Sequence, residues 1–192
     1  SLSGEKVVAG GVEEARRAGY LTGSLTESGM SPLATLAYSR PALAAFGAMG
    51  VLWGTFAAAL PDLKAMLGVD EAQLGLLIFF PPIAAITAML LAPAFGAALG
   101  RAALPLATAL MALGFALPGQ VWAVWMFPLA MACAGAATGL TDVLMNARVS
   151  AMENARRLHL MNLAHAVYSF GYAGGAILTG AMRGAGWGPG WV

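Results

Sequence analysis

The amino-acid sequence predicts an all-α membrane protein with about five transmembrane helices, and three observations support this prediction. Hydrophobic residues make up 59% of the 192 residues and charged residues only 10%, whereas a soluble domain carries about a quarter charged residues to hydrate its surface. The mean hydropathy is +0.75. The apolar residues also fall into five separate runs, each able to cross a hydrocarbon core that needs about 20 helical residues.

The five predicted helices follow a polar N-terminal segment. Prolines within or near the apolar runs do not exclude helix, because neighbouring helices in a membrane satisfy the carbonyls that proline frees. Residues 1–40 are polar and mixed in charge, which predicts a cytoplasmic, mostly disordered tail. Met30 offers a start codon whose use would leave residues 1–29 outside the native protein. The predicted bundle, 41–192, has its helices at 41–60, 73–97, 102–118, 121–147 and 158–182.

The basic residues predict how the chain is oriented. With the N-terminus in the cytoplasm, eight of the ten Lys and Arg residues lie inside and only Lys64 and Arg183 lie outside, which is the positive-inside pattern. The net charge of +1 leaves no basic footprint for nucleic acid, and the single cysteine, Cys133, excludes an intrachain disulfide. We therefore expect a multi-pass protein of the cell (inner) membrane, with the lipid bilayer as its surroundings and no metal.

Small residues four positions apart predict close packing between helices. This spacing places two small side chains on one helix face, where the backbone of a neighbouring helix can approach. Such pairs occur in four of the five predicted helices, which favours a tightly packed bundle. The pairs are Gly50/Gly54, Gly96/Gly100, Gly135/Gly139 and Gly171/Gly175.

Polar residues on the fourth and fifth predicted helices form the candidate site. Asp142 is the only acid within the predicted spans, and Asn146 lies one helical turn later on the same face. An ionisable side chain inside a span costs about 2.5–3.5 kcal/mol, so it usually faces a cavity and has a function. If the two helices are antiparallel neighbours, Asp142 and His165 both lie roughly 10 Å deep. The stripe on the fifth helix consists of Asn162, His165, Ser169 and Tyr172, at helical spacing.

Structural roles remain open for the same residues. Asp142 is alternatively a hydrogen-bond partner for a neighbouring helix, and His165 a packed neutral imidazole. Asn146 and Asn162 are as well suited to bonding helix to helix as to binding a ligand. Glu153 and the two arginines that follow it are expected to form a solvated loop with local ion pairs.

Three segments give the chain a family resemblance that covers residues 41–192. The segment 139–146, Gly-Leu-Thr-Asp-Val-Leu-Met-Asn, and the segment 161–171, Met-Asn-Leu-Ala-His-Ala-Val-Tyr-Ser-Phe-Gly, resemble helices four and five of the major facilitator superfamily (MFS). The similarity is greatest to its fucose-permease-like branch and uncharacterised relatives. Residues 60–64, Leu-Pro-Asp-Leu-Lys, followed by Gln-Leu-Gly at 73–75, resemble the end of helix one and the start of helix two.

The resemblance implies roles for the polar residues. Asp142 would be the carboxylate that couples transport to the proton gradient, and Asn146, Asn162 and His165 would face the central substrate cavity. We add Ser169, on the same stripe, to the expected substrate-binding residues.

Two features depart from the family pattern. Ala97 occupies the position of an acid in the loop between helices two and three. The first predicted helix also lacks the acid that sugar permeases of this branch carry, since Asp62 lies beyond its end.

The function expected is part of a secondary active transporter that moves a small polar solute, sugar-like or otherwise hydroxylated, by proton-coupled alternating access. Such transporters have twelve helices in two halves, so we expect this chain to be the N-terminal part, truncated before the sixth helix, with the C-terminal half as its partner. The proton gradient would serve in place of a cofactor. The alternative is a truncated, non-transporting membrane remnant or interaction scaffold. An enzyme is not expected, because the sequence lacks His-Glu-x-x-His and Gly-x-Ser-x-Gly motifs.

Overall fold

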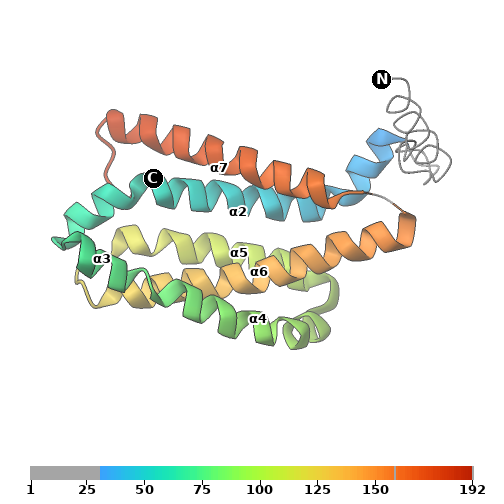
Figure 1. Cartoon of the computed structure of the whole chain (residues 1–192), viewed down its shortest axis with the longest axis horizontal. Helices are drawn as coiled ribbons and strands as arrows, with labels where there is room; N and C mark the ends of the chain where they lie inside the picture. Colours follow the sequence, from blue (N-terminus) through green and yellow to red (C-terminus); the bar gives the residue numbers. More distant parts are fainter. Residues whose placement is uncertain (1–30, 158, 192) are drawn as a thin grey trace, which may run out of the picture.

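The computed structural model describes residues 31–157 and 159–191, and all regular structure within these ranges is helical. The longer helices run along the long axis of the molecule (Figure 1). The elements are α2 (Pro32–Leu67), α3 (Glu71–Leu77), α4 (Phe80–Leu99), the 3-10 turn η1 (Gly100–Ala102), α5 (Ala103–Ala116), the 3-10 turn η2 (Pro118–Gln120), α6 (Met126–Arg156) and α7 (Met161–Gly184).

Three helical stretches in the described part of the chain are long and apolar enough to cross a membrane: Leu33–Leu67, Glu71–Gln120 and Met126–Arg156. The second stretch contains two of the predicted spans, which η1 separates. The fifth predicted span, α7, is not among the three, because its stripe of polar side chains lowers its hydropathy. The chain is therefore an all-α membrane protein, as its composition predicts.

The first helix begins earlier than predicted. Pro32 occupies the first turn of α2. Proline is tolerated there because an N–H group in the first turn makes no hydrogen bond within the helix. Ser31 caps this end, since its side chain accepts a hydrogen bond from the N–H of Ala34 at 3.2 Å. Residues 32–40 are thus helical, and the prediction of a disordered tail is wrong for them. The remaining tail prediction, including the question of residues 1–29, falls outside the described residues.

The second predicted helix, 73–97, is two helices in the structure. Asp70 caps α3, and Gln73 bonds back to the N–H of Asp70 in a reciprocal capping box. The helix ends at Leu77, and α4 begins at Phe80, just before the pair Pro81 and Pro82. Proline lacks an N–H and its ring clashes with the carbonyl four residues earlier, so the chain breaks before the pair.

The remaining predicted helices form with shifted ends. The predicted span 102–118 corresponds to α5, and the predicted span 158–182 to α7. The predicted span 121–147 corresponds to α6, which starts later, at Met126, and continues to Arg156. The extension of α6 carries Glu153 into the helix, where the sequence predicted a loop.

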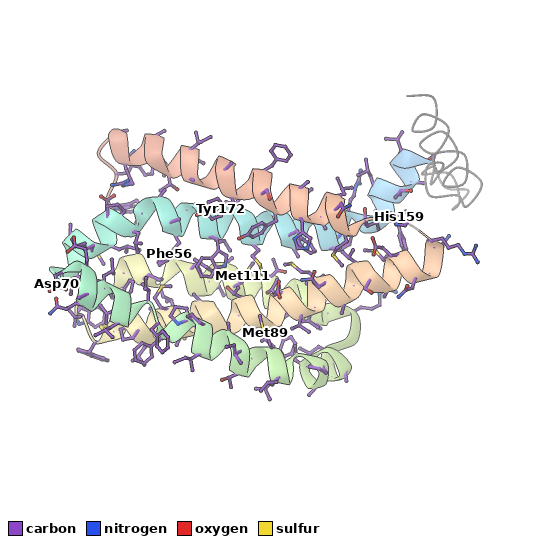
Figure 2. The ribbon with its side chains drawn as sticks, in the orientation of Figure 1. Phe56, Asp70, Met89, Met111, His159 and Tyr172 are labelled. Carbon is purple, nitrogen blue, oxygen red and sulfur yellow. The ribbon has the colours of Figure 1, made fainter. Side chains whose placement is uncertain are left out.

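The helices pack in two pairs, with α5 between them. α7 lies along α2, α4 lies along α6, and α5 contacts α6 and α2 (Figure 1). A buried cluster between the pairs includes Phe46, Met111 and Val149. Figure 2 shows Met111 inside the bundle and places Asp70 and His159 at its opposite ends.

Glycines set the contact between α2 and α7. A Cβ atom added to Gly50 would lie 2.1 Å from the carbonyl oxygen of Tyr168, and one added to Gly54 would lie 2.0 Å from that of Tyr172. On the facing helix, added Cβ atoms at Gly171 and Gly175 would lie 2.7 and 2.4 Å from backbone oxygens of α2. The two backbones are therefore too close for any larger residue, as the spacing predicts.

The contact between α4 and α6 is built in the same way. Cβ atoms added to Gly135 and Gly139 would each lie 2.3 Å from a backbone oxygen of α4.

The pair Gly96/Gly100 behaves differently. An added Cβ at Gly96 would meet only the tip of the Leu144 side chain at 3.1 Å, and one at Gly100 would meet nothing within 4 Å. Gly100 instead ends α4 with a φ of 52°, so its predicted packing role is wrong.

Candidate functional site

Asp142 and Asn146 form a hydrogen-bonded pair near the middle of α6. The side-chain amide of Asn146 donates to the Oδ1 atom of Asp142 at 3.2 Å and to its main-chain oxygen at 2.9 Å. Both residues are partly buried. The structure shows no other hydrogen bond to this carboxylate from the described residues, which leaves the Oδ2 atom open to a proton or a solute.

His165 of α7 packs against α2. Its ring makes an edge contact with the ring of Phe46 on α2, with centroids 5.3 Å apart and an angle of 76°. His165 therefore packs on α2, and it makes no hydrogen bond to Asp142 among the described residues.

The other predicted residues of α7 are exposed. Asn162, His165 and Ser169 all lie on the surface of the bundle. The Ser169 hydroxyl donates to the main-chain oxygen of His165 at 2.9 Å, a local bond that serine commonly makes within a helix. α7 is thus exposed along a polar stripe while its glycine face is packed on α2.

A different side of α7 is apolar and exposed. Phe170 is 79% exposed and Ile177 74% exposed, which suits contact with lipid tails. A polar stripe is costly in the same environment, because its groups lose the hydrogen bonds of water. The stripe that contains Asn162, His165 and Ser169 is therefore expected to face water or protein.

The helix pairing differs from the sequence prediction. We expected α6 and α7 to be direct neighbours across their short connection, but α7 packs along α2 and makes few contacts with α6. The reason lies in the glycines: Gly171 and Gly175 fit the backbone of α2, and Gly135 and Gly139 fit that of α4. The helices α6 and α7 therefore have no close-packed interface with each other.

Glu153 has a function in the fold that sequence reasoning missed. Its Oε1 atom accepts hydrogen bonds from the main-chain N–H groups of Leu160 and, at 2.8 Å, of Met161. These are orphan donors at the start of α7, and a carboxylate there also complements the helix dipole. The prediction that Glu153 belongs to a solvated loop is wrong. The sequence did not predict this capping role because Glu153 lies seven residues before Leu160, on the preceding helix.

A second missed contact is an ion pair between the C-terminal parts of α2 and α7. Arg183 donates from Nη2 to Asp62 Oδ1 at 2.9 Å and from Nε to Asp62 Oδ2. This two-pronged geometry is the one that arginine makes best with a carboxylate. The predicted topology had placed both residues outside the membrane, and their opposite charges at one end of the bundle were the signal that could have revealed the pair.

Among the described residues, no group of three or more His, Cys, Asp or Glu side chains is arranged to hold a metal ion. Comparison of the chain with protein-family models, curated proteins and solved structures finds no match. The fold and the site define an all-α membrane protein with a polar face that includes a partly buried acid.

Proposed function

We propose that this chain is the N-terminal part of an MFS-type secondary active transporter, which moves a small hydroxylated solute across the inner membrane by proton-coupled alternating access. The partly buried pair of Asp142 and Asn146 near the middle of α6 is the observation that carries the proposal. The other predicted site residues, Asn162, His165 and Ser169, lie on an exposed polar stripe of α7. An acid near the middle of a membrane helix is costly unless it has a function.

The geometry suggests a division of roles. Asn146 holds one carboxylate oxygen of Asp142, so the orientation of the acid is fixed while the other oxygen can take up a proton. The exposed side chains of Asn162, His165 and Ser169 offer donors and acceptors suited to hydroxyl groups. Protonation of Asp142 on one side of the membrane and release on the other would couple solute movement to the proton gradient.

The proposed orientation places the N-terminus in the cytoplasm. The ion pair between Asp62 and Arg183 joins two groups that this topology assigns to the outer side. Asp70, assigned outside, and His159, assigned inside, lie at opposite ends of the bundle (Figure 2). The basic residues collect at the proposed inner side, in line with the positive-inside rule.

Uptake into proteoliposomes tests the coupling role, with the complete transporter that contains this bundle and a panel of radiolabelled sugars and polyols. We expect an inward proton gradient to drive accumulation by the wild type. Asp142→Asn should abolish this dependence but leave exchange without a gradient, because the amide keeps the hydrogen bond and cannot carry a proton. Asp70→Asn is the matched control, since asparagine caps a helix as well as aspartate does.

Two results would contradict the proposal. Uptake that remains equally dependent on the proton gradient in Asp142→Asn would remove Asp142 from the coupling step. A wild-type protein that is folded and correctly inserted but moves no solute of the panel would favour the non-transporting scaffold.

A further inference from the structure

A cavity of about 400 Å³ lies at the turn between α4 and α5, on a different face of α6 from the candidate site. Its walls include Pro41 of α2, Gly100 and Arg101 of η1, Leu104 of α5, and Ala147 and Arg148 of α6. The turn lies at the end of the bundle where α2 begins and α7 begins (Figure 1). Cavities of this size accommodate small ligands.

The charge of this cavity is positive. Arg101 and Arg148 reach it from separate elements, and no acid lines it. Within the described part of the chain, the ion pairs are Lys64 with Glu71 and Arg183 with Asp62, so neither cavity arginine takes part in one. Both arginines are exposed. Two guanidinium groups that share a cavity repel each other unless an anion lies between them.

The start of α5 forms another wall of this cavity. Ala103 and Leu104, in the first turn of α5, line it. The 3-10 turn η1 runs directly into α5, and the main-chain N–H of Ala103 donates to the main-chain oxygen of Gly100. The donors that this cavity offers to an anion are therefore the arginine side chains.

We propose that this cavity binds a phosphate-bearing anion. Arginine matches phosphate with paired hydrogen bonds, and here two arginines reach the cavity from separate elements. Basic pockets between membrane helices on the cytoplasmic side bind anionic headgroups, so an anionic phospholipid is one source of the phosphate. A soluble phosphate is the other. The proposal goes beyond transport and does not depend on it.

The first arm of the test measures lipid binding. The full chain is placed in phosphatidylcholine nanodiscs that contain a small fraction of spin-labelled phosphatidylglycerol, and the immobilised fraction is read by electron paramagnetic resonance. Arg101→Gln and Arg148→Gln should each weaken binding about tenfold, since each removes hydrogen bonds between charged groups. The control Arg157→Gln removes an equal charge at the same end of the bundle. Measured in the same buffer, it should leave binding unchanged, because Arg157 does not line the cavity.

The second arm measures free phosphate. Equilibrium dialysis of the detergent-solubilised chain against radiolabelled inorganic phosphate uses the same variants. Arginine-dependent binding of phosphatidylglycerol alone identifies a lipid headgroup as the ligand, and arginine-dependent binding of inorganic phosphate alone identifies a soluble anion. Either result supports the cavity as a phosphate site.

A second pair of variants distinguishes a loss of binding from a loss of the fold. Ala147→Asp places a negative charge in the cavity wall and should expel the anion, whereas Ser150→Asp adds the same charge to an exposed position of α6 that does not line the cavity. Equal binding by these two variants, or an equal loss in the arginine variants and Arg157→Gln, would overturn the proposal. Circular dichroism and gel filtration establish that each variant is folded.

Discussion

The glycine contacts and the polar face of this molecule are built on opposite principles. Where α2 meets α7 and where α4 meets α6, the backbones approach so closely that an added Cβ would fall 2.0–2.7 Å from a backbone oxygen. Where the polar residues of α6 approach α7, the two helices make few contacts. At the first kind of contact, no side chain larger than that of glycine fits between the two backbones. The second consists of a hydrogen bond within α6 and an edge contact between His165 and Phe46.

This difference assigns stability to the glycine contacts and chemistry to the polar face. Helices in lipid gain little from the hydrophobic effect when they associate, so close van der Waals packing must hold them together. A polar face without tight packing can change its protonation or its ligands without disturbing the pairs. Variants at the two kinds of contact separate these two contributions.

Gly54→Ala should have the largest effect on stability. Its new Cβ would meet the backbone of Tyr172, which cannot move aside as a side chain could, so α2 and α7 must separate. We expect a loss of about 3 kcal/mol in the free energy of unfolding, at the upper end of the cost of overpacking. Denaturation in mixed micelles measures it.

Gly174→Ala is the matched control, because the same methyl group on α7 would meet nothing within 4 Å. Within a helix, alanine is more stable than glycine by about 0.5–1 kcal/mol, so this variant should be as stable as the wild type or slightly more stable. If the two variants were equally stable, the glycine contact would not hold α2 and α7 together.

The connection between the two helix pairs is expected to be less sensitive. Glu153→Ala leaves two N–H groups at the start of α7 without their acceptor, which should cost about 1–2 kcal/mol. Hydrogen exchange at Leu160 and Met161 should accelerate. Glu153→Gln keeps an acceptor oxygen and should restore part of the protection. Unchanged exchange in Glu153→Ala would mean that water or another group satisfies these donors equally well.

The sequence predicted the parts of the structure that depend on local pattern. Apolar run length located the helices, although it missed the break before Pro81 and Pro82. Glycine spacing located the close contacts, since two small residues on one face have few other uses. Helical periodicity placed Asp142 and Asn146 on one face, where they form a hydrogen bond.

The choice of partners could not be predicted in the same way. Whether Gly171 faces α2 or α6 depends on how the two surfaces fit, which no single helix encodes. The ion pair of Asp62 and Arg183 joins residues 121 positions apart, and the turn between Glu153 and α7 hid the cap. The glycines Gly96 and Gly100 show the converse error, because their spacing matches but neither would meet the backbone of a neighbouring helix: Gly96 faces a side chain of α6 and Gly100 faces open space.

The smallest predicted effect on stability is on the polar face. Asn146→Ala removes the hydrogen bond to Asp142, and such bonds between membrane-helix side chains contribute about 0.6 kcal/mol on average. The exposed Asn154 of α6 is the matched control, and Asn154→Ala should be neutral by the same denaturation measurement. A cost for Asn146→Ala as large as that for Gly54→Ala would show that the polar face is a structural interface, and would remove the support that it gives to a solute site. A small cost together with altered solute affinity would assign Asn146 to binding, because a residue that contributes little to the fold has then a separate function in the site.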